Sequence, residues 1–106
     1  MAAERRARLH PAALAELIEG AAQYEEQRED RGVNFEKAVE RAIALIVSAP
    51  ERWPLAPRVS PRRGAHRYVL KHFPYDVIYR LVGADELEVV ALAHHKRRPG
   101  YWAKRW

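Results

Sequence analysis

Histidine, arginine and aromatic side chains gather near the C-terminal end of the sequence, in a pattern suited to phosphate chemistry. The run from His94 to Arg98 is followed closely by Tyr101 and Trp102. Cleavage of RNA by its own 2′-hydroxyl requires a base, an acid, and cations that stabilise the charged phosphorane. Histidine serves as base or acid near neutral pH, and the planar fork of arginine matches phosphate. Aromatic rings can stack on unpaired bases.

Two arginines upstream extend this set, because they lie in the two segments expected to form strands of the same sheet as the strand that leads into His94. The candidate residues for phosphate chemistry are Arg67, Arg80, His94, His95, Arg97, Arg98, Tyr101 and Trp102. The structural alternative stays open for each of them. A histidine can be a core residue, the aromatic rings can cover the end of the core, and the arginines can be solvated. Neighbouring side chains on a strand point to opposite faces, so at most one of His94 and His95 is expected to face the site.

The positive charge of the chain is concentrated in two segments. The chain carries a formal net charge of +5, with +5 in residues 51–75 and another +5 in residues 94–106, while residues 11–50 sum to −4. If the two basic segments meet in space, they form one cationic surface. Such a surface attracts RNA, DNA or an acidic protein segment.

The composition bounds the class of protein. A chain of 106 residues has room for one domain and one modest core, so residues 1–106 are predicted to form a single domain. The absence of cysteine excludes disulfides and Cys-based zinc sites and is compatible with a cytoplasmic location. No metal site or cofactor is expected, because the histidines lack carboxylates at ligand spacing. No apolar run approaches the length of a membrane span.

Two amphipathic helices are predicted in the first half. The first opens at His10-Pro11 and runs to about Asp30, where Gly32 stops it. Its polar side is expected to hold Glu16 and Glu19, pointing away from the apolar stripe. The second starts at an Asn34 N-cap and ends at Pro50. The short connection between them predicts a helix hairpin.

Strands are predicted in the second half, after a proline-rich loop over residues 51–64. They cover residues 65–73, 75–82 and 87–93, and Gly83 to Glu86 form the turn between the last two. A further edge strand could occupy residues 4–9, and residues 101–106 could form a short helix. The expected fold class is therefore α+β, with an N-terminal helix hairpin packed on a small antiparallel sheet.

Three C-terminal motifs resemble the RelE/ParE superfamily of toxins from type II toxin–antitoxin modules. They are the strand from Phe73 to Tyr79, the strand end Ala91-Leu92-Ala93-His94, and the pattern Arg97-x-Pro99-x-Tyr101-Trp102-x-x-Arg105. The upstream helix hairpin and the connection from Pro50 to Pro54 match the layout of that superfamily too. The resemblance implies a cytosolic toxin that is neutralised by a cognate antitoxin.

The resemblance implies two alternative cellular targets. RelE-like members cut mRNA in the ribosome, whereas ParE-like members act against DNA gyrase without a known nuclease site. On the RelE-like reading, the catalytic residues are His94, Arg97, Tyr101 and Arg80, and the substrate-binding residues are Arg67, Arg98, Trp102 and Arg105. RelE-like nucleases carry an arginine where this chain has Asp76, whose carboxylate would repel phosphate. A third alternative is a non-catalytic module that keeps the fold and only binds protein or nucleic acid.

Overall fold

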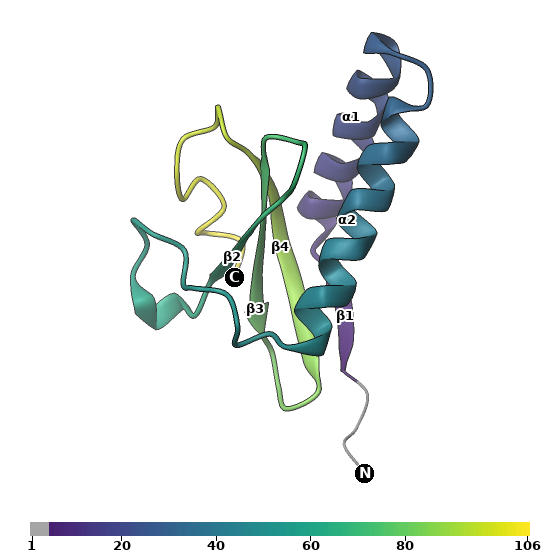
Figure 1. The fold of residues 1–106 in the computed structure, drawn as a ribbon. Coiled ribbons are helices and arrows are strands. Elements are labelled where there is room, and N and C mark those ends of the chain that lie inside the picture. Colours follow the sequence, from purple (N-terminus) through teal and green to yellow (C-terminus); the bar gives the residue numbers. More distant parts are fainter. Residues whose placement is uncertain (1–4) are drawn as a thin grey trace.

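The computed structural model describes residues 5–106, which fold into two helices and a four-stranded sheet. The elements follow the order β1 (Arg6–Leu9), α1 (Pro11–Gln27), α2 (Arg31–Ser48), a 3₁₀ turn (Pro61–Arg63), β2 (His66–Val69), β3 (Tyr75–Leu81) and β4 (Glu86–His94). The predicted α+β fold class is confirmed. Figure 1 shows the helix hairpin on one side of the sheet, and the proline-rich loop and C-terminal segment on the other.

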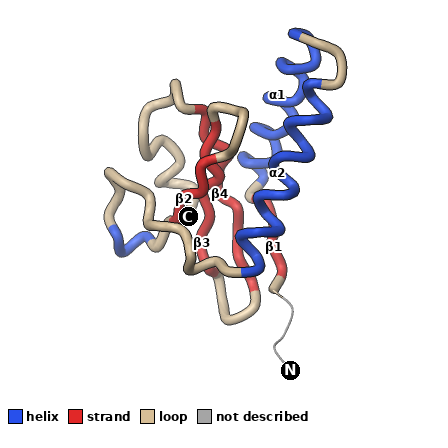
Figure 2. The backbone as a smooth tube through the Cα atoms, viewed as in Figure 1, coloured by secondary structure: helices blue, strands red, loops and turns tan. Residues whose placement is uncertain are grey.

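The sheet has the strand order β1-β4-β3-β2, so the last strand in the chain is a central one. β2, β3 and β4 pair antiparallel as the sequence predicts. β1 adds a parallel pair with β4, which makes the sheet mixed rather than wholly antiparallel (Figure 2). The edge strand predicted over residues 4–9 is present from Arg6, while residues 1–4 lie outside the described part of the chain.

Each face of the sheet buries its own apolar cluster. The face toward the helices buries Phe35, Val39 and Ile46 of α2 against Val77 and Tyr79 of β3, together with other residues. The opposite face buries a smaller cluster, whose members come from the sheet, the loop and the C-terminal segment: Ala56, Ala65, Ile78, Val90, Ala91, Ala93 and Trp102. The C-terminal segment is therefore held against the sheet by a core of its own.

The hairpin between the helices differs from the prediction. Gly32 lies inside α2 rather than stopping α1, and the residue that precedes α2 is Asp30 rather than Asn34. A Cβ on Gly32 would lie 2.5 Å from the carbonyl oxygen of Ala21, so glycine permits the close approach of the two helices. The carboxylate of Glu25 accepts hydrogen bonds from the backbone N–H groups of Asp30 and Gly32, and these replace the side-chain cap expected from Asn34.

The helix anticipated over residues 101–106 is not formed. Separate tight turns occur instead, in which Ala103 N–H donates to Gly100 and Arg105 N–H donates to Trp102. Six residues are too few to stabilise a helix by backbone bonding alone. Their side chains contact both α1 and the sheet, and these contacts set the path of the segment.

Candidate functional site

Glu16 of α1 joins the first helix to the C-terminal segment, and we call these contacts the Glu16 junction. Its carboxylate accepts hydrogen bonds from both terminal nitrogens of the Arg105 guanidinium, Nη1 at 2.9 Å and Nη2 at 3.0 Å. It also accepts hydrogen bonds from the Tyr101 hydroxyl and, at 3.1 Å, from the backbone N–H of Leu92. Arg97 lies 3.5 Å away as a further ion-pair partner. The sequence assigned Glu16 to the solvent side of the helix, and the structure shows that this was wrong.

The junction fixes the protonation of Tyr101. Burial, the hydrogen bond to Glu16 and its negative charge raise the pKa of the Tyr101 hydroxyl well above the ordinary value. The Arg97 guanidinium lies 3.8 Å from the centre of the Tyr101 ring, and that of Arg105 lies 5.1 Å from it. Tyr101 is therefore a neutral hydrogen-bond donor that is held by its neighbours from several sides.

A bulge in β4 decides which histidine faces which side. Ile78 of β3 pairs with Ala91, whereas the next residue, Tyr79, pairs with Val89, so Val90 is the extra residue. As a result Leu92 lies in the helix-facing cluster, and His94, two residues further along β4, lies on the same face of the sheet. The His94 ring packs edge-on against Tyr75 with 4.9 Å between ring centres.

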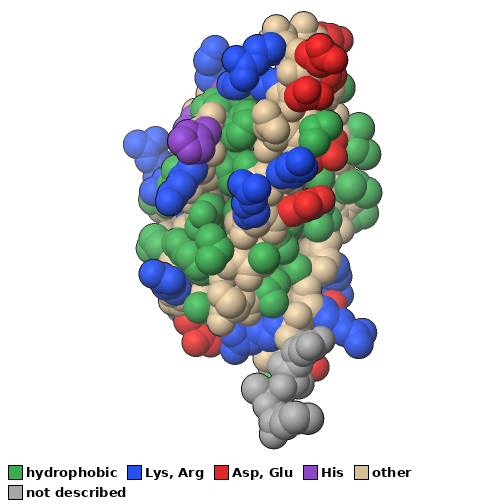
Figure 3. Space-filling view, turned by 45° about the vertical axis from the view of Figure 1, so that its right-hand side comes forward, with side chains coloured by type: hydrophobic (Ala, Val, Ile, Leu, Met, Phe, Trp, Pro, Cys, Tyr) green, Lys and Arg blue, Asp and Glu red, His purple; other side chains and the backbone are tan. Residues whose placement is uncertain are grey.

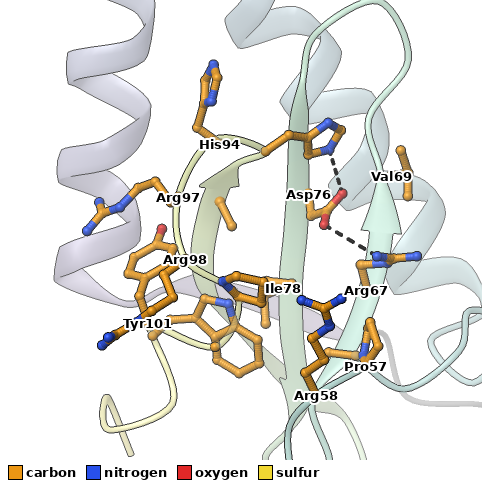
Figure 4. A pocket seen from close by; sticks show the side chains of 16 residues that line it. Pro57, Arg58, Arg67, Val69, Asp76, Ile78, His94, Arg97, Arg98 and Tyr101 are labelled. Atoms are coloured by element: carbon orange, nitrogen blue, oxygen red, sulfur yellow. Dashed lines mark hydrogen bonds and ion pairs between the residues drawn. The ribbon is translucent and has the colours of Figure 1, made fainter.

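His94 is held in a partly buried setting. Its Nδ1 accepts a hydrogen bond from the backbone N–H of Lys96 at 3.0 Å, which places any ring proton of the neutral form on Nε2. Partial burial lowers the pKa of His94, and the positive charges of Lys96 and His95 add to the effect. In the close-up His94 points away from Arg67 and Asp76 (Figure 4).

The outer face of the sheet carries a hollow of about 570 Å³, which we call the outer cleft. Arg58, Arg67 and Arg98 contribute cations to its lining, and Ile78 and Trp102 contribute apolar surface. Asp76 lies within it, 2.9 Å from His95 and 3.9 Å from Arg67. Figure 4 shows these residues converging from the sheet, the proline-rich loop and the C-terminal segment. The two basic segments of the sequence therefore meet here.

Arg80 lies outside the outer cleft, and Trp102 forms part of its lining without offering a free ring face. Arg80 donates to Glu88 at 3.0 Å, and its guanidinium lies 5.4 Å from the centre of the Trp106 ring. Trp102 is only 3% exposed and stacks on Trp106, so it has no free face on which a base could stack. Both residues help to hold the C-terminal segment on the sheet.

The structure divides the predicted site residues into groups that partly overlap. Arg97, Tyr101 and Arg105 meet at the Glu16 junction, and Arg80 pairs with Glu88. The lining of the outer cleft holds Arg67, Arg98 and Trp102, and also His94, Arg97 and Tyr101. Sequence reasoning missed Glu16 and Arg58. One feature of the sequence could have predicted the role of Glu16. It is a carboxylate in the second turn of a helix that has to pack on the sheet, close to the basic C-terminal segment.

A sequence profile for the ParE toxin of the type II toxin–antitoxin system parDE matches residues 7–99. This match spans nearly the whole described fold. The chain belongs to the ParE toxin family. A search of curated proteins finds no match.

Several chains in solved structures share the fold of this ParE family member. One of them belongs to the chromosomal ParDE toxin–antitoxin system from P. aeruginosa, with a TM-score of 0.72 and 13% sequence identity over 86% of this chain and 96% of that one. At this identity the likeness concerns the fold alone. Within residues 5–106, neither helix combines the length and the apolar character needed to cross a membrane.

Proposed function

We propose that this chain is the toxin of a type II toxin–antitoxin module and that it inhibits growth by binding DNA gyrase rather than by cutting mRNA. One observation carries the choice of target. Three of the four residues expected to catalyse cleavage are held in ion pairs or hydrogen bonds with carboxylates of the same chain: Arg97 and Tyr101 with Glu16, and Arg80 with Glu88. The ion pair with the mostly buried Glu88 compensates the charge of Arg80, whereas Arg97 is 53% exposed and its 3.5 Å pair with Glu16 is screened by solvent.

The remaining groups supply little of what RNA cleavage needs. Tyr101 is a poor base, because its hydroxyl proton is donated to Glu16 and its pKa is raised. Asp76 places a carboxylate in the outer cleft, where it repels phosphate. His94 is available through Nε2 and lines the same hollows as Arg97, but the Arg97 guanidinium is directed at Glu16 and at the ring of Tyr101. The base is therefore accompanied by a cation that groups of the same chain already engage.

The outer cleft has the character of a protein-binding surface. Apolar side chains form much of its lining and arginines lie among them, a combination that is enriched at protein interfaces. Arg98 is exposed and reaches the cleft from the loop after β4, so it is well placed to meet a carboxylate on the target. We assign Arg67 and Arg98 to target contact on this basis.

Membership of the ParE family also supports a cognate antitoxin as partner and a cytoplasmic site of action. The antitoxin would have to cover the surface that meets the target. A chain with a net charge of +5 favours an acidic segment in that role.

The proposal is tested by inducing the chain in cells without the neighbouring gene and following growth, DNA breaks and message ends together. We expect growth arrest with DNA breaks that are covalently linked to gyrase, and intact mRNA. Purified gyrase with the protein added should reproduce the breaks.

Two results would contradict this proposal, each in favour of another reading. Message cut at ribosome-bound codons, without gyrase-linked breaks, would make the chain an mRNA interferase. Normal growth with folded protein present would indicate a non-catalytic binding module.

A further inference from the structure

A second basic surface lies on the other side of the molecule, between α2 and the connection from β2 to β3. It is a hollow of about 400 Å³, which we call the α2 hollow. Its cationic lining comes from Arg31, Lys37, Arg41 and Lys71, with His72 beside them. None of the lining residues carries a carboxylate. Most of these cations come from residues 11–50, whose net charge is −4. The net charge of that segment therefore gives no sign of the basic surface.

The charges of α2 are sorted onto separate faces of the helix. Lys37 and Arg41 are four residues apart and therefore stack on one face, whereas Glu36 and Glu40 stack on another. Like charges at this spacing repel each other and destabilise a helix. Among these four residues, Lys37 and Glu40 are three apart and form the one pair of opposite charges at neighbouring spacing. The order nonetheless places Lys37 and Arg41 together along the hollow, with both glutamates outside its lining.

The cations of the α2 hollow also lack partners nearby. None of the ion pairs found among residues 5–106 involves Arg31, Lys37, Arg41 or Lys71. Lys37, Arg41 and Lys71 are exposed. Arg31 is oriented by two aromatic rings, with its guanidinium 4.9 Å from the centre of Tyr24 and 5.2 Å from that of Phe73. This contrasts with the Glu16 junction, where every arginine meets a carboxylate.

The backbone at His72 adds an independent observation. His72 has a φ of 69°, in the left-handed region that a residue with a side chain rarely adopts. Asp30 and Arg58 adopt the same region, and histidine tolerates it better than most residues do, so the conformation sets the path of this turn. Here the turn sets Lys71 and His72 along the rim of the hollow, opposite the cations of α2. In the view from the helix side, Lys and Arg side chains lie around a histidine at the upper left (Figure 3).

We propose that the α2 hollow binds the phosphodiester backbone of a nucleic acid. From Arg31 to Arg41 the helix advances about 15 Å, long enough to face several successive phosphates. The lining holds none of the large exposed apolar residues of the described chain, and the rings of Tyr24 and Phe73 are buried. A protein partner would seek such apolar anchors, whereas backbone phosphates need only cations. The inference goes beyond the proposed function and does not depend on gyrase being the target.

The test is binding of the purified chain to a fluorescein-labelled 20-base-pair DNA duplex, followed by anisotropy over a range of salt. The hollow variant carries Lys37→Gln, Arg41→Gln and Lys71→Gln. The matched control carries Arg6→Gln, Arg62→Gln and Lys104→Gln, which remove the same charge from exposed sites elsewhere. A third variant, Lys37→Arg with Arg41→Lys and Lys71→Arg, keeps the charge of the hollow. Circular dichroism melts check that all variants fold.

We expect the hollow variant to bind DNA at least tenfold more weakly, while the control and the charge-keeping variant stay within about threefold of the wild type. The slope of log affinity against log salt should fall by about three in the hollow variant alone. The same measurements with a single-stranded RNA show whether DNA or RNA supplies the phosphates. Weaker binding of either nucleic acid by the hollow variant supports the proposal. No binding to DNA or RNA, or equal loss in the hollow variant and the control, would overturn it. Binding of a polyglutamate peptide is measured alongside. A hollow variant that loses binding to this peptide but keeps binding to nucleic acid would also overturn the proposal.

Discussion

Arginines occur at the Glu16 junction and in the outer cleft, but the two regions use them differently. At the junction, Arg97 and Arg105 face one carboxylate whose side chain is 13% exposed. In the outer cleft, Asp76 is nearly as buried, at 16% exposed, but it bonds His95 and lies 3.9 Å from Arg67. Arg58 and Arg98 are exposed and take part in no ion pair among residues 5–106. Residue type alone therefore does not separate a structural arginine from one that meets a partner. The number and length of the bonds that an arginine makes to a carboxylate do.

The comparison predicts where stability and activity reside. Substitutions at the junction should lower the free energy of unfolding, because they leave buried polar groups without partners. Substitutions in the cleft should lower toxicity and leave unfolding unchanged.

The largest effect is expected for Glu16→Ala. It removes the acceptor of Arg105, Tyr101 and the Leu92 N–H together. We expect a loss of about 3 kcal/mol in the free energy of unfolding, measured by urea denaturation. Glu19→Ala, on the exposed side of the same helix, serves as the control and should change it by less than about 0.5 kcal/mol. Equal effects of the two would mean that the junction contributes nothing.

A smaller effect is expected for Tyr101→Phe, which removes one hydroxyl and keeps the ring. The loss at pH 7 should be about 1 kcal/mol. The pKa of Tyr101 is raised in the folded chain, so above pH 10 the unfolded chain releases a proton that the folded chain keeps. Stability of the wild type should therefore fall as pH rises above 10, and by less in Tyr101→Phe. Parallel pH curves for the two proteins would contradict this account of Tyr101.

A weaker pH effect is expected for His94. Its pKa is lowered in the folded chain, chiefly by partial burial, so below pH 6.5 the unfolded chain binds a proton more readily. Stability should fall as pH drops from 7 to 5, and the fall should be shallower in His94→Gln. Thermal melts in buffers across that range measure the difference. A steeper fall in the variant would show that the pKa of His94 is not lowered in the folded chain.

The smallest effect on stability is expected in the cleft. Arg98→Glu should leave the unfolding free energy within about 0.5 kcal/mol of the wild type, because the side chain is exposed. The same change should reduce growth inhibition at least tenfold by placing a negative charge against the target. Lys104→Glu, also exposed and outside the cleft lining, is the matched control. Full toxicity of Arg98→Glu would contradict the assignment of the outer cleft to target contact.

Much of the fold could be predicted from the sequence because its signals are local. Apolar periodicity predicted both helices, and short apolar runs bounded by turn residues predicted the strands that became β3 and β4. The helix hairpin was misjudged at Gly32, where the reason for glycine is a contact with Ala21 of the other helix. Contacts of that kind cannot be read from neighbouring residues.

The site was harder to predict for the same reason. The candidate residues were identified by type and by resemblance, but their grouping depends on Glu16, which lies 85 residues from Tyr101 in sequence. The bulge at Val90 decides which of His94 and His95 faces the helices, and it has no signal in an apolar run of this kind.

The most direct test of the central claim compares wild type with Arg98→Glu in a purified gyrase cleavage assay, alongside a ribosome-bound message assay. Our account predicts gyrase-linked double-strand breaks with the wild type, at least tenfold fewer with the variant, and uncut message with both. Cut message with wild-type protein, together with intact DNA, would contradict it.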